Sequence, residues 1–264
     1  MIRLEGIQKY FNRGTVNESH LFRGFNLDIQ DGDFVSVVGS NGSGKTTMLN
    51  ILCGSLPCDG GRILVDGRDV TALPEHRRAA SIGRVYQDPA MGTVPDMTIL
   101  ENLSLAANKG KPYGFTPAVS RRKAGLFREL VASVGLGLED RMDIPVGSLS
   151  GGQRQALSLL MSTMTPIDLL ILDEHTAALD PKTAETVMQI TRRIVAEKGV
   201  TTLMVTHNMN DAIRLGNRLI MMHEGHVIYD VAGDEKKSLT VADLLQKFEE
   251  VSGGELANDR MLLS

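Results

Sequence analysis

The pattern of apolar and polar segments in the first third of the chain predicts short strands separated by turns. Three segments are rich in apolar and β-branched residues, as strands are: residues 2–11, 21–29 and 34–38. The polar segment 12–19 between the first two predicts a loop, and Asp31-Gly32 predicts the turn before the third. After Gly39 the spacing of apolar residues changes, and residues 46–52 are expected to form a helix.

Beyond this helix, Ile63-Leu64-Val65 predicts another short strand, and the pattern from Asp88 to about Pro166 is mostly helical. A Gly- and Pro-rich stretch at residues 110–117 predicts a surface loop within the helical region. The basic run at residues 121–123 is interpreted as a solvated helix start rather than a face toward lipid headgroups.

The second half of the chain alternates strand and helix. Four consecutive apolar residues, 169–172, predict a strand buried on both faces, as in a parallel sheet. Asp180 is a predicted helix cap, with Pro181 in the first turn and Gly199 at the end. The inward stripe of that helix is expected to be Ala184, Val187, Met188, Thr191, Ile194 and Val195.

Residues 201–206 predict the next strand, and residues 218–229 a hairpin that turns at Glu224-Gly225. The charged tail beyond Asp230 contains one amphipathic pattern, at residues 241–248. The whole pattern indicates an α/β protein. Because no internal repeat is visible, we expect a single copy of this fold.

Composition narrows the class of protein. The chain of 264 residues is 42% hydrophobic and 23% charged with a net charge of −4, which argues against a dedicated nucleic-acid binder. No apolar run approaches the roughly 20 residues of a membrane-spanning helix, and the N-terminus lacks the apolar core of a signal peptide. We therefore expect a cytoplasmic protein. Cys53 and Cys58 have no other Cys or His pair at ligand spacing, so buried or incidental thiols are favoured over a metal or redox pair.

A glycine-rich segment carries the first candidate chemistry. Gly39-Ser40-Asn41-Gly42-Ser43-Gly44-Lys45-Thr46 matches the phosphate-binding pattern G-x-x-x-x-G-K-[ST] between a predicted strand and a predicted helix. Its amides and the helix N-terminus would surround phosphates, Lys45 would reach the β- and γ-phosphates, and Thr46 would bind Mg²⁺. The alternative, a glycine-rich turn without catalytic meaning, does not explain Lys-Thr at this offset. We assign ATP binding to Gly39, Ser40, Asn41, Gly42, Ser43, Gly44, Lys45, Thr46 and Thr47.

Two carboxylates close the apolar strand at residues 169–172. Residues at the carboxyl ends of parallel strands face the ligand crevice, so Asp173 is expected to hold Mg²⁺ through a water and Glu174 to accept a proton from the attacking water. The alternative is a simple solvated strand end. His207 ends the next strand in the same way and is expected to hydrogen-bond the γ-phosphate, although a lone His in that position is usually structural.

The chain resembles the ATP-binding cassette (ABC) family over about residues 2–230. The resemblance includes an intact family signature: Leu149, Ser150, Gly151, Gly152 and Gln153. It also includes a Q-loop glutamine (Gln87), the Walker B end (Asp173-Glu174), a D-loop (Asp180) and a switch histidine (His207). Phe11 resembles the aromatic residue that stacks on adenine, with Tyr10 as the alternative.

The resemblance implies an α/β fold with a P-loop NTPase core, a mixed and mostly parallel sheet, an N-terminal antiparallel β subdomain and an inserted helical subdomain. The expected division is a nucleotide-binding core at 1–87 and 167–230, a helical signature subdomain at 88–166 and a tail at 231–264. The implied catalytic residues are Glu174, His207, Gln87 and Asp180, and the implied metal site is Thr46, Gln87 and Asp173.

The family mechanism needs a second copy of the chain. The resemblance implies that two cassettes enclose two ATP molecules head to tail, and that Ser150 and Gly152 of one copy would contact the γ-phosphate held by Lys45 of the other. The chain departs from the family at His175, where proline is more frequent before Thr176. Because the change removes no catalytic group, we interpret His175 as a tolerated substitution rather than a catalytic residue.

Two kinds of work for the ATP remain open: energising a membrane transporter, or a soluble role such as iron–sulfur assembly. Residues 88–147 leave no room for the long coiled-coil insertion of repair-type members, and residues 98–103 resemble the start of the helical subdomain in transporter cassettes. We therefore favour a bacterial importer cassette at the cytoplasmic face of the membrane, working with permease subunits and an extracytoplasmic solute-binding protein. Residues 173–183 and 204–209 resemble an importer group associated with aromatic amino acids.

Overall fold

A computed structural model describes residues 1–111, 119 and 123–252. The chain forms two compact units, the first built from residues 1–78 and the chain after residue 199, the second from residues 79–199. Most of the loop expected at 110–117, and two of the three residues in the basic run at 121–123, lie outside the described residues.

The N-terminal strands of the first unit form an antiparallel sheet in the order β2-β1-β4-β5. Its strands are β1 (Ile2–Phe11), β2 (Ser19–Ile29), β4 (Gly60–Val65) and β5 (Arg68–Asp69). Ile2 and Leu4 of β1 are buried between partly buried neighbours, and a register shift in the pairing with β2 then makes Ile7 the next buried residue. β2 and β4 begin earlier than expected because pairing with β1 extends them, down to Ser19 and Gly60.

A second sheet of the first unit has the order β10-β9-β3-β8. Its strands are β3 (Phe34–Gly39), β8 (Thr202–Val205), β9 (Arg218–His223) and β10 (His226–Ala232). β3 is buried along its whole length and runs parallel to both β8 and β9. The β9–β10 turn falls at Glu224-Gly225 as predicted, with φ values of 44° and 77°. Positive φ at both residues suits a two-residue turn between twisted strands.

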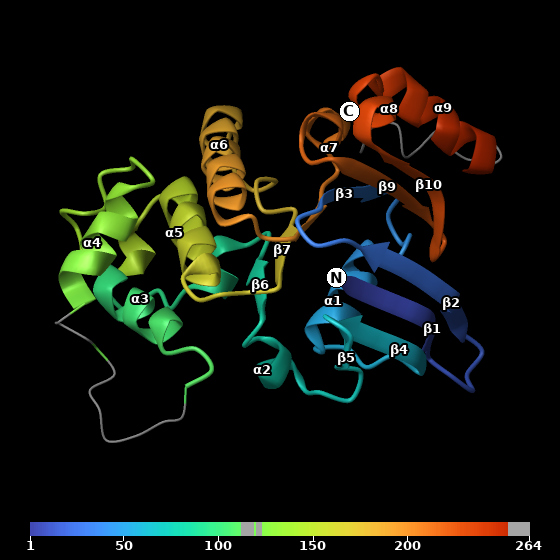
Figure 1. The fold of residues 1–264 in the computed structure, drawn as a ribbon, viewed down its shortest axis with the longest axis horizontal. Helices are drawn as coiled ribbons and strands as arrows, with labels where there is room; N and C mark the ends of the chain where they lie inside the picture. The colour runs from blue at the N-terminus through green and yellow to red at the C-terminus, as the bar shows by residue number, and fades with distance from the viewer. Residues whose placement is uncertain (112–118, 120–122, 253–264) are drawn as a thin grey trace. The chain divides into compact units, whose positions relative to one another are not determined.

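The helices of the first unit are α1 (Lys45–Cys53), α2 (Glu75–Arg78), α7 (Met209–Arg214), α8 (Gly233–Lys237) and α9 (Val241–Ser252). Figure 1 shows α7, α8 and α9 gathered beside β9 and β10. The amphipathic helix expected at 241–248 is confirmed as α9. The sequence does not predict the short helix α8, because its five residues are mostly charged and show no helical spacing of apolar residues. Its Lys236 is buried and donates to the carbonyls of Ile213, Leu215 and Gly216 at the end of α7.

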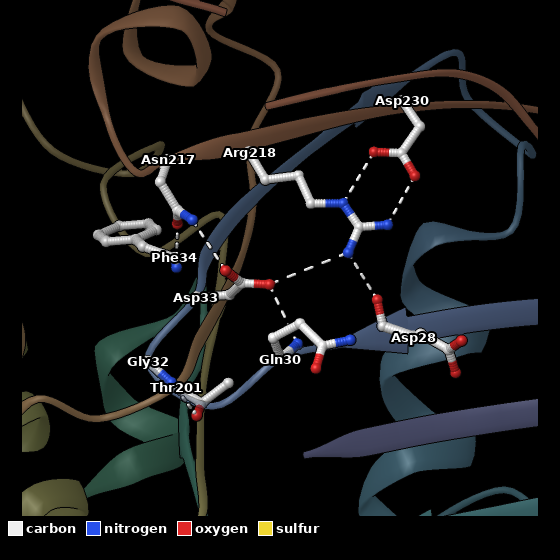
Figure 2. Close-up of polar contacts among 9 residues, drawn as sticks. All are labelled: Asp28, Gln30, Gly32, Asp33, Phe34, Thr201, Asn217, Arg218 and Asp230. Carbon is white, nitrogen blue, oxygen red and sulfur yellow. Dashed lines mark hydrogen bonds and ion pairs between the residues drawn. The ribbon is translucent and has the colours of Figure 1, made fainter. Parts of the chain in front are cut away.

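A polar network links the two sheets of the first unit at the start of β3 and β9 (Figure 2). Arg218 makes a two-pronged contact with Asp230, with Nε–Oδ1 at 2.8 Å and Nη2–Oδ2 at 2.6 Å, and donates to the carbonyl of Asp28 at 2.6 Å. Asn217 donates to Asp33 at 2.8 Å. The hydrogen bonds to Asp230 raise the pKa of Arg218. The end of β2 is thereby tied to the β9–β10 hairpin by charge-assisted hydrogen bonds.

The second unit contains the parallel pair β6 (Ile82–Val85) and β7 (Leu169–Asp173). Its described helices are α3 (Ile99–Ala107), α4 (Ala124–Ala132), α5 (Gly151–Thr163) and α6 (Pro181–Lys198), with 3-10 turns η1 (Pro89–Gly92) and η3 (Val146–Ser148). α6 begins at the predicted Asp180 cap and ends at Gly199 in the left-handed conformation. Its buried face matches the prediction except that Ile190 is also buried and Ala184 is only partly buried.

The observed pairs are parallel except for β9–β10 and the N-terminal sheet, so the expected α/β fold is confirmed. α6, the helix between β7 and Gly199, buries one apolar face as the 3.6-residue period predicts. Within the part of the chain that the structure describes, none of the helices combines the length and apolar character needed to cross a membrane.

Candidate nucleotide site

The glycine-rich loop between β3 and α1 needs its glycines for both conformation and space. Gly39, Gly42 and Gly44 have φ values of 152°, 77° and 102°, a region that residues with a side chain rarely adopt. A Cβ atom on Gly39 would lie 2.1 Å from the carbonyl oxygen of Met222, and one on Gly44 would lie 2.9 Å from the Phe22 ring. The loop therefore leaves no room for a side chain at Gly39 or Gly44, and successive glycines of this kind allow backbone amides to turn toward a bound phosphate.

Lys45 is the positive centre of this loop. Its side chain is buried, with the residue 5% exposed, and Nζ donates to the carbonyls of Gly39 at 2.7 Å and Ser40 at 2.9 Å. α1 begins at Lys45, and its cap residue Gly44 supplies no side-chain hydrogen bond to the first turn. Thr46 in the same turn is exposed. A lysine ammonium beside helix N-terminal amides is an arrangement that binds phosphate oxyanions.

The two candidate aromatic residues on β1 differ in their surroundings. The Tyr10 ring stacks on His20 at 3.8 Å between centroids and 11° between planes, and the Arg13 guanidinium lies 4.9 Å from its centroid. Phe11 is partly exposed and has Lys9 Nζ 5.7 Å from its ring centroid. Because His20 already stacks on Tyr10, the contacts favour Phe11 as the ring offered to adenine, and this assignment stays a prediction.

The carboxyl ends of β6 and β7 bring Gln87, Asp173 and Glu174 to one edge of the parallel pair in the second unit. Arg84 of β6 forms an ion pair with Asp173, with Nη2 and Oδ2 2.7 Å apart and side chains 12% and 13% exposed. Sequence reasoning missed Arg84. The sequence feature that could have identified Arg84 is its charge within the otherwise uncharged strand Ile82–Val85.

Glu174 leaves the strand in an unusual backbone conformation. Its φ is 47°, which is uncommon for a residue with a side chain, and its carbonyl accepts from the amide of Ala177 at 2.9 Å. Such strained positions are found disproportionately at functional sites. Glu174 itself is only partly buried, whereas the next residue, His175, turns into the interior.

His175 packs against α6 and has a structural role. It is 2% exposed, and its Nε2 lies 3.1 Å from Oγ1 of Thr191. Because the Thr191 hydroxyl donates to the carbonyl of Val187 at 2.9 Å, its oxygen is left to accept a hydrogen from Nε2. Burial lowers the pKa of His175 to about 4, so the imidazole is neutral at physiological pH.

This lowered pKa predicts a specific acid sensitivity of folding. His175 takes up a proton near pH 6.5 in the unfolded chain but only near pH 4 in the folded chain. Its contribution to the free energy of unfolding is therefore fully present above pH 6.5 and is lost as the pH falls toward 4. We expect His175 to account for about 2 kcal/mol of lost unfolding free energy between pH 7 and pH 5. Urea unfolding at both pH values measures it.

His175→Gln provides the comparison, because it keeps a hydrogen-bond donor but does not titrate. The exposed His226 supplies the control variant His226→Gln, which should keep the wild-type pH dependence. Equal pH dependence in wild type and His175→Gln would contradict the prediction.

The signature residues occupy the start of α5, where they also serve the fold. Ser150 caps the helix, with a reciprocal hydrogen bond to Gln153, and is exposed. A Cβ atom on Gly152 would lie 2.1 Å from Cγ2 of Thr183 in α6, so α5 and α6 need a glycine there to approach each other. Leu149 is buried, and Gly151 is exposed.

The remaining candidates lie where the patterns placed them. Asp180 caps α6, and its hydrogen bonds from Thr183 lower the pKa of the exposed carboxyl. Gln87 is exposed just beyond β6. His207 follows β8 in the first unit and is partly buried, at the same end of the parallel β3–β8 pair as the phosphate loop. The two cysteines are free, as expected, with Cys53 buried.

Comparisons with known proteins agree with this geometry. The ABC transporter family profile matches residues 22–177. A tyrosine transport ATP-binding protein of Clostridioides difficile is 47% identical over 94% of this chain and 99% of its own length. A dimeric ATP-binding cassette in a post-hydrolysis state bound to ADP and Pi has 30% identity, covers 88% of this chain and 98% of that one, and superposes with a TM-score of 0.72.

A further solved structure, cbiO1 from Clostridium perfringens, part of the ABC transporter complex cbiONQ, has 25% identity and a TM-score of 0.73 over 99% of this chain and 96% of its own. The family profile covers more than half of the chain, and the first relative aligns along nearly all of it. The chain therefore belongs to the ABC transporter family, in which it is an ATP-binding and ATP-hydrolysing subunit.

Proposed function

We propose that this subunit energises the import of an amino acid, with tyrosine or a related aromatic amino acid as the cargo. The observation that carries the proposal is the alignment with the tyrosine transport ATP-binding protein, which runs nearly end to end in both chains. The transported cargo does not contact a cassette of this kind, so the phosphate loop carries no information about it. The support for the substrate class is the similarity to a protein that serves tyrosine transport.

We propose the following division of labour among the site residues. Lys45 and the amides from Gly39 to Thr47 bind the β- and γ-phosphates, and Phe11 stacks on adenine. Glu174 accepts a proton from the attacking water, and His207 contacts the γ-phosphate. Gln87 and Asp180 are the other two catalytic residues of the proposal. The support is the match of each residue to its family motif together with its position at a strand or helix end within its own unit.

The residues present fit Mg²⁺ delivered with ATP. No cluster of three or more His, Cys, Asp or Glu side chains that could hold an ion alone exists among the described residues. That suits Mg²⁺, which keeps several waters and binds through substrate phosphates and one or two protein oxygens. Thr46 would supply a hydroxyl, Gln87 an amide oxygen and Asp173 a carboxylate. Arg84 pairs with Oδ2 of Asp173, which holds the carboxylate in place. The ion would neutralise charge on the phosphates.

The assembly we propose contains a second copy of the chain, permease subunits and an extracytoplasmic solute-binding protein. The related cassettes solved as a dimer and as part of a transporter complex support the first two. Residues 149–153 would contact ATP held by the partner copy, and residues 88–166 would form the subdomain that meets the permease. This assembly places the chain on the cytoplasmic face of the membrane, without nucleic acid as a partner.

The test begins with the complex isolated from native membranes in mild detergent. We expect mass spectrometry to find a polytopic membrane protein and a solute-binding protein in stoichiometric amounts. After reconstitution into vesicles, ATP-dependent uptake of labelled tyrosine should exceed that of labelled lysine, and a complex carrying Lys45→Ala should show background uptake. Soluble partners alone would indicate the other branch, such as an iron–sulfur assembly ATPase. A membrane complex that ignores aromatic amino acids would refute the cargo assignment only.

A further inference from the structure

The tip of the β9–β10 hairpin, residues 222–225, holds the phosphate loop through its backbone. Gly39 pairs with Met222 as neighbouring strands meet, so closely that a Cβ on Gly39 would lie 2.1 Å from the Met222 carbonyl oxygen. Beyond this pair, the amide of Gly225 donates to the carbonyl of Ser43 at 2.9 Å. The backbone of the loop is thus held at Gly39 and again at Ser43, shortly before Lys45.

One side chain of the hairpin tip joins these backbone contacts. His223 Nδ1 lies 3.4 Å from the Ser40 hydroxyl, between the two backbone contact points along the loop. Its imidazole meets the ring of Phe248 edge to face, with centroids 5.4 Å apart and planes at 82°. Phe248 is a buried residue of α9. The contacts form a continuous path from α9 through His223 to the phosphate loop.

α9, where that path begins, is packed into the hydrophobic core of the first unit. Leu244 and Phe248 share one buried cluster with Val38, the residue before Gly39, and with Met209, the first residue of α7. α9 is therefore part of the core that supports the loop. The phosphate contacts proposed for the loop involve neither His223 nor α9.

We propose that His223 is a positioning residue for ATP binding, through which α9 sets the affinity of the phosphate loop. His223 acts on the nucleotide only through Ser40. By holding the Ser40 side chain, it restricts the backbone between Gly39 and Gly42, whose amides must converge on phosphate oxygens. A loop already in its binding conformation loses less entropy when ATP arrives, so affinity rises without a new contact to ATP. The inference rests on the ATP-binding role proposed for the loop.

The test compares variants at position 223 in steady-state ATPase assays and ATP-binding calorimetry. His223→Ala should raise KM and Kd for ATP about three- to tenfold, the size of one net hydrogen bond, with kcat at saturating ATP within about twofold. Asn places a polar atom where Nδ1 lies, so His223→Asn should restore affinity to within about twofold, whereas the longer His223→Gln should not. Phe248→Leu keeps an apolar residue but loses the ring contact, and should give a smaller rise.

A double-variant cycle with Ser40→Ala separates positioning from general destabilisation. If His223 acts through Ser40, the double variant should bind ATP no more weakly than the weaker single variant. His226→Ala, on the exposed side of the same turn, is the matched control and should match wild type. Unchanged KM in His223→Ala, no recovery in His223→Asn, or additive effects in the cycle would overturn the proposal. If His223→Ala does not fold, the Asn and Gln variants decide the question. Failure of the wild type to bind ATP would count against the phosphate-loop role instead.

Discussion

Replacing Glu174 with glutamine is expected to slow ATP hydrolysis by about 10²–10⁴-fold while ATP binding is retained, because the variant loses the base that takes a proton from water. Glutamine has nearly the same shape as glutamate, so it should preserve the turn at this position, where φ is 47° and Ala177 donates to the residue's carbonyl. The neighbouring Asp173–Arg84 ion pair does not involve the replaced atoms. Single-turnover phosphate release and ATP-binding calorimetry measure the two quantities separately.

A matched control for this variant lies on α6. Glu197→Gln removes one carboxylate from the exposed face of that helix and should leave turnover unchanged. Because hydrolysis is blocked after binding, Glu174→Gln should also accumulate as an ATP-bound dimer on size-exclusion chromatography, whereas the control should not. Wild-type turnover in Glu174→Gln would remove Glu174 from the role of general base.

Lys45→Ala should weaken ATP binding by about 10²–10³-fold, since charge-assisted hydrogen bonds from one ammonium to phosphate contribute about 3–4 kcal/mol together. The same change deletes the cation that joins the carbonyls of Gly39 and Ser40 inside the loop. We therefore also expect a loss of about 1–3 kcal/mol in unfolding free energy. Calorimetry with ATP, ADP and AMP checks the assignment, because the loss should be large for ATP and ADP and small for AMP.

The control for Lys45→Ala is Lys237→Ala, which removes an exposed lysine paired with Asp234 on α8. Exposed ion pairs of this kind contribute between 0 and about 1 kcal/mol, so this variant should bind ATP and unfold like wild type. An unchanged ATP affinity in Lys45→Ala, with the protein folded, would show that the phosphates are held elsewhere.

Local features of the site were predictable because they depend on neighbouring residues. The glycines of the loop, the Asp180 cap and the Glu224-Gly225 turn are set by backbone preferences over a few residues, and each lies where the pattern predicted. The buried strand before Asp173 follows from a continuous apolar run. The roles of Gln87, the signature residues and the D-loop came from family resemblance, since spacing alone assigns them no chemistry.

Contacts between distant segments were not predictable, because they depend on which surfaces meet when the core is buried. Arg84 and Asp173 are 89 residues apart in sequence and pair only because β6 and β7 lie side by side. The sequence favours a tolerated substitution at His175, but only the packing against α6 shows that burial keeps its imidazole neutral and that Thr191 accepts its hydrogen bond. Gly152 likewise has a structural reason that appears only when α5 and α6 approach each other.

The sequence by itself determined the fold class, the phosphate loop and the family, because hydrophobic period and turn chemistry act over short distances. The tertiary structure decided what supports that loop. Met222, His223 and Gly225 reach it from a hairpin almost two hundred residues further along the chain, and α9 reaches it through Phe248. The physical reason is that burying apolar surface joins whichever segments share a core, and their separation along the chain leaves no local signal of that contact.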